Sequence, residues 1–508
     1  MTKTTKLPGK PTSFWLDSTT ETNFPPMENV TVDVAVIGAG IAGITAAYLL
    51  KKAGKTVALV EAKQVAASAS GHTTAKVTSL HQLIYADLID QIGEDKARLY
   101  GESNQAGVEF VASTVEQEGI DCDFQRNDTY SFAESQDNLD KIQKEYDAAI
   151  KLGLPAEFVT ETTLPFEIAG AVKFTNQAQF HVRKYLLHLV NTIGGDGSYV
   201  FEDSRVQTVE EGTPCKVVAN ETTLLATDVI LTTHLPIVDT GLFFAKTYPQ
   251  RSYIIGAKIN PEKAPEGMYI GVGKNYHSIR TTPTEDGGLL LLIGGGGHKV
   301  GAKSETEESY EELERYAHSH FGIDKIDYRW SSQDYESFDK LPYIGKLTPT
   351  NEHIYVATGF SLWGMSKGTM SGMILSDLVQ NKANPWADLY DSLRATPFVT
   401  TESIKNNLEV GMHWVGDRLK GLQNWSTDDV EPGEGKLITV NGDKVGVYKD
   451  ETGKVTAVSA TCPHLACIVN WNSAEKSWDC PCHGARFTCE GKVIQGPAVK
   501  DLEQKAVS

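Results

Sequence analysis

Cysteine and histidine side chains near the end of the chain have the types and spacing for metal chemistry. Cys462 and His464 form a C-x-H pair, and Cys480 and His483 form a C-x-x-H pair. Two thiolates and two imidazoles suit a pair of iron ions with sulfur ligands on one iron and nitrogen ligands on the other. The same four side chains could also hold one tetrahedral structural zinc ion. The spacing predicts a metal centre and leaves these two kinds open.

Residues next to the two pairs favour iron over zinc. Gly484 follows His483, and residues 491–498 contain a glycine-proline step that a zinc finger would not explain. With these features the segment resembles the Rieske 2Fe-2S domain, in which a proline loop covers one side of the cluster. The resemblance implies that one iron is ligated by Cys462 and Cys480, and the other by His464 and His483. It also implies a disulfide between the two ligand loops, joining Cys467 and Cys482.

A second stretch with a chemical task lies near the N-terminus. Residues 32–37 are typical of a buried strand, residues 38–43 (Gly-Ala-Gly-Ile-Ala-Gly) of a tight turn and residues 44–53 of a helix, and a second strand ends at Glu61. This order matches the dinucleotide-binding fingerprint. Its glycines allow the turn, the approach of backbone to the pyrophosphate and close helix packing, and the acid binds the ribose hydroxyls. A carboxylate there would repel the 2′-phosphate of NADP, so FAD and NAD remain.

Three features favour FAD over NAD. The small residues of 69–76 can run beneath the rest of a long cofactor, and a strand over 354–358 ends at Gly359 before another helix. The third feature is chemical, because an iron-sulfur cluster carries one electron at a time whereas most substrates give two. A flavin can release such a pair one electron at a time, and a nicotinamide cannot readily do so.

The first 385 residues resemble the FAD-dependent oxidoreductases of the D-amino-acid, glycine and sarcosine oxidase group. The matching pieces are residues 38–61, 70–76, 226–232 and 341–345, the last leading to 357–359. With the C-terminal segment, the whole chain resembles the bacterial flavoprotein-Rieske fusions. The resemblance implies that FAD contacts Gly38, Gly40, Ile41, Ala42, Gly43, Glu61, Ala62, Ser70, Gly71, His72, Thr73, Thr74, Val206, Gly359, Phe360, Gly364 and Met365.

Length and charge restrict the organisation and the partners. At 508 residues the chain should form two or three domains. Its formal net charge of −19 argues against nucleic acid and anionic membranes as partners, since both need basic surface. No apolar run reaches the length of a membrane span, and the first twenty residues lack a signal-peptide core. We therefore expect a cytoplasmic protein.

The predicted fold is an α/β FAD-binding Rossmann-like domain with an inserted α+β substrate domain, followed by a small all-β Rieske domain. A linker over 386–428 carries Ile404, Leu408, Met412, Val415 and Leu419 on one helical face. This helix is either an ordinary packed connector or a dock for the Rieske domain. The expected parts are an N-terminal arm lying across the surface (1–30), the FAD-binding domain (31–84, 181–239 and 336–385), the substrate-binding domain with an antiparallel sheet (85–180 and 240–335), the linker, and the Rieske domain (429–508).

Candidates for contact with the substrate are fewer and rest on residue type. Arg280 could bind a substrate carboxylate, because a guanidinium group forms two parallel hydrogen bonds to it. Tyr253, Tyr343 and Trp363 could line an amine pocket, because aromatic faces attract cations. Each of the four also has an ordinary structural interpretation, as a surface arginine or a core aromatic residue.

The sequence therefore predicts an FAD-dependent amine or amino-acid dehydrogenase. It would oxidise the C–N bond of a small-molecule amine or amino acid and pass electrons singly from flavin through the Rieske cluster to an external one-electron carrier. Two alternatives remain open. Electrons could enter through the cluster and reduce the flavin, or the protein could be a non-enzymatic redox sensor.

The predicted cluster should have a low reduction potential. High-potential Rieske proteins carry Ser and Tyr just after Cys-His-Gly, and the hydrogen bonds of these hydroxyls to sulfur raise the potential. Here the positions hold Ala485 and Phe487. We expect a potential in the lower part of the roughly −150 to +300 mV Rieske range. Redox titration monitored by electron paramagnetic resonance measures it, and a value near the top of the range would contradict the prediction.

Overall fold

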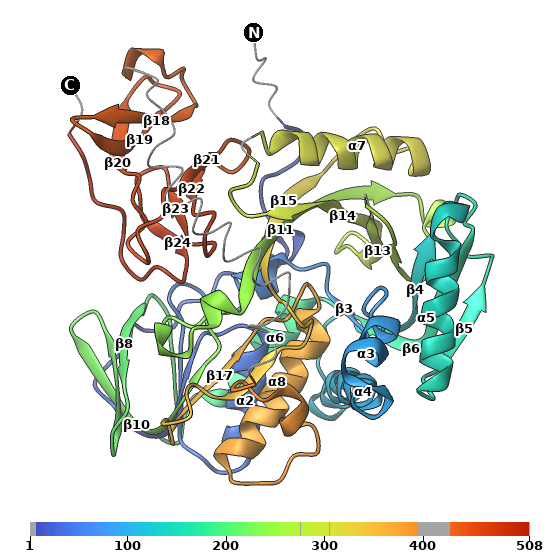
Figure 1. Ribbon diagram of the computed structural model, residues 1–508, viewed down its shortest axis with the longest axis horizontal. Helices are drawn as coiled ribbons and strands as arrows, with labels where there is room; N and C mark the ends of the chain where they lie inside the picture. The colour runs from blue at the N-terminus through green and yellow to red at the C-terminus, as the bar shows by residue number, and fades with distance from the viewer. Residues whose placement is uncertain (1–6, 275, 304, 395–426, 507–508) are drawn as a thin grey trace.

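The computed structural model describes residues 7–274, 276–303, 305–394 and 427–506 (Figure 1). Its first sheet is built around a parallel core in the strand order β16-β17-β10-β1-β2-β7, in which β16 is antiparallel to β17 and the hairpin of β8 and β9 continues from β10. The strands are β1 (Thr31–Ile37), β2 (Val57–Val60), β7 (Tyr199–Phe201), β8 (Val206–Glu210), β9 (Cys215–Ala219), β10 (Thr222–Leu231), β16 (Tyr343–Lys346) and β17 (Ile354–Thr358).

The dinucleotide fingerprint forms the centre of this sheet. β1 pairs in parallel with both β2 and β10, and helix α2 (Ile41–Lys52) follows directly from the glycine turn. Gly38 has φ of +102°, which favours glycine, and a side chain at Gly43 would collide with the carbonyl oxygen of Gly38. Helix α8 (Gly364–Val379) packs against α2, and helix α6 (Val182–Ile193) also contacts α2. The α/β FAD-binding part predicted from the sequence is confirmed.

A second, largely antiparallel sheet forms the inserted α+β part. Its strand order is β15-β11-β14-β13-β12-β4-β6-β3, with β5 paired to β6 and a parallel step between β12 and β4. Strand β3 belongs to this sheet although its residues precede the boundary expected at residue 85. The strands are β3 (Lys76–Val77), β4 (Gln125–Ala133), β5 (Ala156–Val159), β6 (Gly170–Gln179), β11 (Thr247–Ile259), β12 (Met268–Gly271), β13 (Ser278–Pro283), β14 (Leu289–Lys299) and β15 (Tyr328–Ser337).

Helices cover this second sheet and connect it to the first. Helix α7 (Glu307–Phe321) packs on β14 and β11, and α5 (Leu139–Lys151) packs on β5 and β6. The long helix α4 (Glu94–Glu118) follows α3 (Tyr85–Ile92) and lies against α8. At that crossing a Cβ atom on Gly107 would come within 2.8 Å of the Ser366 carbonyl oxygen. The helices therefore join the two parts into a continuous core.

The N-terminal arm, which the sequence predicted to lie across the surface, is anchored by a few buried residues. Phe14 and Trp15 of the short helix α1 (Phe14–Asp17) are buried, and the expectation that the whole arm lies on the surface is wrong. Ser13 Oγ donates to the carbonyl of Gly71, and Trp15 Nε1 donates to that of Thr73 at 2.7 Å. The reason is that these side chains satisfy the backbone of the small-residue segment, which has few side-chain atoms of its own to do so.

The C-terminal part is small and all-β, as predicted, and lies at the upper left of Figure 1 beside β11 and β15. The expected linker helix with Ile404 and Leu419 lies outside the described residues. Within the described ranges, no helix is both long and apolar enough to cross a membrane. The part has a three-stranded sheet of β18 (Gly435–Val440), β19 (Asp443–Lys449) and β20 (Val455–Ser459), and a four-stranded sheet of β21 (Asn470–Asn472), β22 (Ser477–Asp479), β23 (Arg486–Thr488) and β24 (Val493–Gln495).

The packing of the glycine turn generates a stability prediction. Gly43→Ala should destabilise the protein by about 1–3 kcal/mol or more, since the new methyl group overpacks against the Gly38 carbonyl and lies 2.6 Å from Thr232 Oγ1. FAD affinity should fall with it, because the turn must shift. Gly194→Ala is the control, as a Cβ atom at that residue would have nothing within 4 Å. Urea unfolding and FAD titration measure both effects, and equal behaviour of the two variants would refute the packing role.

Candidate functional site: a metal centre beside a cofactor cavity

The four side chains predicted as metal ligands come together between two loops of the C-terminal part. The thiols of Cys462 and Cys480 hydrogen-bond to each other, which raises the pKa of Cys462. The rings of His464 and His483 lie 5.0 Å apart between centroids. A disulfide with an S–S distance of 2.03 Å joins Cys467 and Cys482, as expected from the resemblance. The two loops are thereby tied together around the four side chains.

Unpartnered atoms test whether a Rieske cluster fits here. The Nδ1 atoms of His464 and His483 are both buried and have no hydrogen-bond partner among the described residues. A buried nitrogen without a partner is costly, so two of them side by side indicate atoms reserved for a ligand. The Sγ atoms of Cys467, Cys480 and Cys482 lie within 4.8 Å of one another, but two of them are consumed by the disulfide. Two thiols and two imidazole nitrogens remain, which fits a 2Fe-2S cluster.

No hydroxyl from the expected positions reaches the cluster site. Ala485 and Phe487 are both fully buried. The hydroxyl of Tyr335 comes from β15 of the second sheet, and it donates to the backbone carbonyl of His483 at 2.9 Å rather than to sulfur. Gln333 Nε2 donates to the Gly484 carbonyl at 2.8 Å. These contacts hold the second ligand loop in place. The side chains at positions 485 and 487 supply no hydroxyl that would raise the reduction potential of the cluster.

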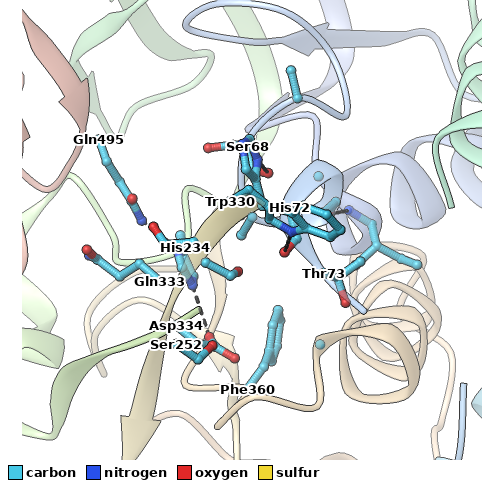
Figure 2. Close-up of a pocket in the computed structure, with 18 of the residues that line it drawn as sticks. Ser68, His72, Thr73, His234, Ser252, Trp330, Gln333, Asp334, Phe360 and Gln495 are labelled. Carbon is cyan, nitrogen blue, oxygen red and sulfur yellow. Dashed lines mark hydrogen bonds and ion pairs between the residues drawn. The ribbon is translucent and has the colours of Figure 1, made fainter. Parts of the chain in front are cut away.

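A cavity of about 840 Å³ runs from the glycine turn to residues 474–476, 486 and 494–496 of the C-terminal part. Its size lies in the upper part of the roughly 300–1,000 Å³ range of small-molecule and cofactor sites. Figure 2 shows Ser68, His72 and Thr73 at one side of it and Phe360 at another. Of the residues predicted to contact FAD, all line this cavity except Gly43, Gly71 and Gly359. A cofactor as long as FAD therefore fits the space that the predicted residues enclose.

The glycine end of the cavity has the features that a dinucleotide needs. The N-terminus of α2 opens onto it at Gly40, and Ser70 Oγ accepts from the backbone nitrogen of Ile41 at 3.0 Å. Glu61 stands at the end of β2 and accepts from the backbone nitrogen of Ala39 at 2.9 Å. Desolvation raises the pKa of Glu61, although its backbone donors oppose this. Helix N-terminus and acid thus stand where pyrophosphate and ribose would bind.

The segment that would lie under the flavin is held from several sides. His72 Nδ1 lies 2.9 Å from the Ser68 carbonyl, and burial lowers the pKa of this imidazole. Trp330 Nε1 donates to the His72 carbonyl at 3.0 Å. Arg280 donates to the carbonyls of Thr74 and Ala75 at 3.1 and 2.7 Å. The backbone of this segment is therefore fixed before any cofactor contacts it.

The residues predicted to meet the substrate divide into two groups. Trp363 lines the cavity and stacks on His81 with centroids 4.8 Å apart. Arg280 differs from the expectation, because its guanidinium is buried beneath residues 74 and 75 and does not line the cavity. Tyr253 and Tyr343 are fully buried core residues that also lie away from the wall. The guanidinium of Arg280 is engaged by backbone carbonyls, and the side chains of the two tyrosines lie in the core.

Lys76 is a residue of the cavity wall whose role the sequence did not indicate. Its side chain is buried, and Nζ donates to the Tyr269 carbonyl and, at 2.5 Å, to Ser278 Oγ. No carboxylate among the described residues forms an ion pair with it. Burial, followed by the charge of Arg280, lowers the pKa of Lys76 well below its usual range. Its position as the one lysine in a run of small residues was the available sequence signal.

The C-terminal part forms one wall of the same cavity. Gln495 of β24 reaches toward His234, as Figure 2 shows, and its Nε2 donates to His234 Nδ1 at 2.9 Å. Because an amide nitrogen can only donate, Nδ1 of His234 is the acceptor. The proton of the neutral imidazole is then on Nε2 of His234, which donates to Asp334 at 3.0 Å. Glu475 and Arg486 also line the cavity. Residues of the metal-binding part therefore enclose the cofactor cavity of the flavoprotein part.

A buried group of four charges joins these two parts. Arg251 of β11 pairs with Glu475 at 3.1 Å, and Arg486 pairs with Glu475 at 2.6 Å and with Asp479 at 3.0 Å. The Arg251 side chain is 1% exposed. Burial alone would raise the pKa of Glu475, but the charges of Arg486 and Arg251 outweigh it and lower that pKa. This charge network, defined by these four residues, fixes the metal-binding part to the second sheet.

Known protein families match both the flavoprotein part and the C-terminal part of the chain. The profile of the family described as FAD dependent oxidoreductase matches residues 33–378, and that of the Rieske [2Fe-2S] domain matches residues 423–506. A protein of Bacillus subtilis (strain 168), "Putative Rieske 2Fe-2S iron-sulfur protein YhfW", is 37% identical over 499 residues, covering 97% of each chain. The fold and the site thus define a flavoprotein with a Rieske domain.

Two further similarities extend over the flavoprotein part. The gamma-glutamylputrescine oxidoreductase of Escherichia coli (strain K12) is 23% identical over 402 residues, which cover 73% of this chain and 88% of the relative. The crystal structure of glycine oxidase from Geobacillus kaustophilus superposes with a TM-score of 0.60 at 17% identity, covering 72% of this chain and 99% of that one. The chain belongs to the FAD dependent oxidoreductase family, binds FAD, and carries a C-terminal Rieske domain that binds a 2Fe-2S cluster.

Removing one member of the charge network should loosen the Rieske domain and the cofactor together. Arg251→Met leaves Glu475 and Asp479 with one cation between them, and breaking such a buried pair costs about 3–5 kcal/mol. The cluster's visible circular dichroism should be lost at lower urea, and FAD should bind more weakly. Glu503→Gln is the control, because its pair with Lys505 is largely exposed and worth at most about 1 kcal/mol. Unchanged FAD affinity in Arg251→Met would show that the Rieske wall does not support the cofactor.

Proposed function

We propose that this protein is an FAD-dependent dehydrogenase that oxidises the C–N bond of a small amine or amino acid and passes electrons singly to an external carrier. The observation that carries the proposal is one cavity that is lined by the dinucleotide turn, the second sheet and residues of the Rieske domain, among them Glu475, Arg486 and Gln495. When bound, FAD accepts the electron pair of the substrate and the cluster carries one electron at a time. The names of the similar proteins, an oxidoreductase of an amine derivative and an oxidase of glycine, support the substrate class.

The cofactor roles in this proposal fall to the residues already described. Cys462 and Cys480 would ligate one iron, and His464 and His483 the other, through the unpartnered Nδ1 atoms. Glu61 would bind ribose hydroxyls, and the backbone at Gly40 and Ile41 would contact the pyrophosphate. The segment from Ser70 to Thr74 would support the flavin ring, with Phe360 and Trp363 at its other side. The remaining space is left for the substrate.

Lys76 gives the cavity a preference for a substrate with a carboxylate. Burial without a counter-charge disfavours the protonated form of Lys76, and an anion that enters the cavity would stabilise that form. The ammonium has two donors engaged by Tyr269 and Ser278, so one donor is left for a ligand. We therefore propose that Lys76, in place of Arg280, meets the substrate carboxylate, and that Trp363 faces the amine end.

A substrate panel tests the reaction and its direction. Under anaerobic conditions, amines and amino acids are added to the holoprotein while flavin absorbance and the cluster's electron paramagnetic resonance signal are followed. The proposal requires a compound that bleaches the flavin first and reduces the cluster second. Reduction of the cluster before the flavin by an external donor would reverse the direction. In a parallel assay in air, rapid peroxide formation without cluster reduction would make the protein an oxidase.

The role of Lys76 is tested with the same panel. Lys76→Met should raise KM for an amino acid about tenfold to hundredfold, because a hydrogen bond to a charged group contributes about 1.5–3 kcal/mol. Substrates without a carboxylate should change little. Lys173→Met removes a lysine that is paired with Asp128 outside the cavity and is the control. Equal losses with amino acids and plain amines would assign Lys76 a packing role only.

A further inference from the structure

A carboxylate of the flavoprotein part contacts one of the proposed cluster ligands. Asp239 begins the short helix η3 (Asp239–Gly241), which follows β10 in the chain. Its Oδ1 atom lies 2.9 Å from Nε2 of His464. Since Nδ1 of that ring is the atom proposed to bind iron, Nε2 carries the proton and donates it to the carboxylate. The contact thus joins the flavoprotein part directly to the metal site.

A second element closes the same edge of the cluster site. Phe244 lies in the next turn, η4 (Phe243–Ala245), and its ring is 5.0 Å from the His483 ring and 5.9 Å from the His464 ring, both edge to face. The side chain of His464 is 6% exposed, and His483 is equally buried. The two imidazole rings are therefore largely shielded from solvent, in part by Asp239 and Phe244 of the flavoprotein part.

We propose that Asp239 sets the reduction potential of the Rieske cluster by accepting the hydrogen bond from His464, and so gives the flavoprotein part control over the cluster. A carboxylate acceptor makes the imidazole a stronger electron donor to iron. The same negative charge opposes the arrival of an electron, since reduction adds negative charge to the cluster. Both effects stabilise the oxidised form and lower the potential, in addition to the absence of hydroxyls at positions 485 and 487.

This inference depends on the cluster ligands and not on the substrate. It can therefore be tested independently of the proposed amine oxidation, because a chemical reductant can titrate the cluster without any substrate turnover. The Asp239 side chain is 44% exposed, so solvent screens part of its charge. We expect its neutralisation to change the equilibrium constant for reduction about threefold to tenfold, which is a rise of about 30–59 mV for a one-electron couple.

The experiment compares three holoproteins by redox titration at one pH, with the cluster content checked by electron paramagnetic resonance. Asp239→Asn keeps the size and an acceptor oxygen but removes the charge, and it should raise the potential. Asp239→Glu restores the charge and should bring the potential back toward that of the unmodified protein. Asp443→Asn is the matched control. This exposed carboxylate lies in a groove with Pro463, next to His464, and within the described ranges it makes no hydrogen bond to a ligand.

Each outcome decides the proposal. A rise in Asp239→Asn with no rise in Asp443→Asn supports it. An unchanged potential in Asp239→Asn with a full cluster would make the contact a docking interaction only and would overturn it. Equal rises of the potential in both variants would also overturn it, because the effect would then come from nearby negative charge in general and not from the hydrogen bond to His464. If Asp239→Asn does not retain its cluster, Asp239→Ser provides the second neutral side chain, and the same two readings apply.

Discussion

The arrangement of this protein depends on the buried charge network of Arg251, Glu475, Asp479 and Arg486. Charges leave water at a high cost, and they repay it only when each meets its partners in a fixed geometry. Here one guanidinium comes from the second sheet and three charges come from the Rieske domain. The pairs between the two parts therefore form only when these parts are docked, and in one orientation. A purely apolar contact would have allowed the Rieske domain more freedom to slide.

The fixed orientation explains why the cofactor cavity has walls from both halves of the chain. Gln495, Glu475 and Arg486 would face solvent in an undocked Rieske domain, and here they line the space beside His72 and His234. The same docking places the Tyr335 hydroxyl on the His483 carbonyl and Phe244 against both imidazole rings. The imidazole edge of the cluster site is thus already occupied within the chain. The position of the cluster site relative to the cofactor cavity is therefore fixed by packing within the chain.

The local motifs were the part of the site that could be predicted from the sequence. The glycine turn and Glu61 belong to one strand-turn-helix-strand unit, and the four proposed cluster ligands form two short pairs, so their spacing reflects local structure. The substrate wall was less accessible. Arg280 was a reasonable carboxylate ligand by type, but three backbone carbonyls bind its guanidinium, and only the fold brings those carbonyls to it. Lys76 lines the cavity, and Arg280 does not, because β3 joins the second sheet, a pairing that a pattern over two residues cannot indicate. The burial of Trp15 under the cofactor segment was missed for the same reason.

By itself the sequence determined the two cofactor-binding units and their order, because glycine conformation, helix starts and ligand spacing are local properties of the chain. It also determined that positions 485 and 487 carry no hydroxyl. Only the tertiary structure decided which charged residues line the cavity, how the Rieske domain is oriented, and that Asp239 contacts His464. The contacts between Arg251 and Glu475 and between Asp239 and His464 join residues more than two hundred positions apart. They depend on how the sheets pack against one another. That packing is determined by the burial of side chains over the whole molecule and not by any short stretch of it.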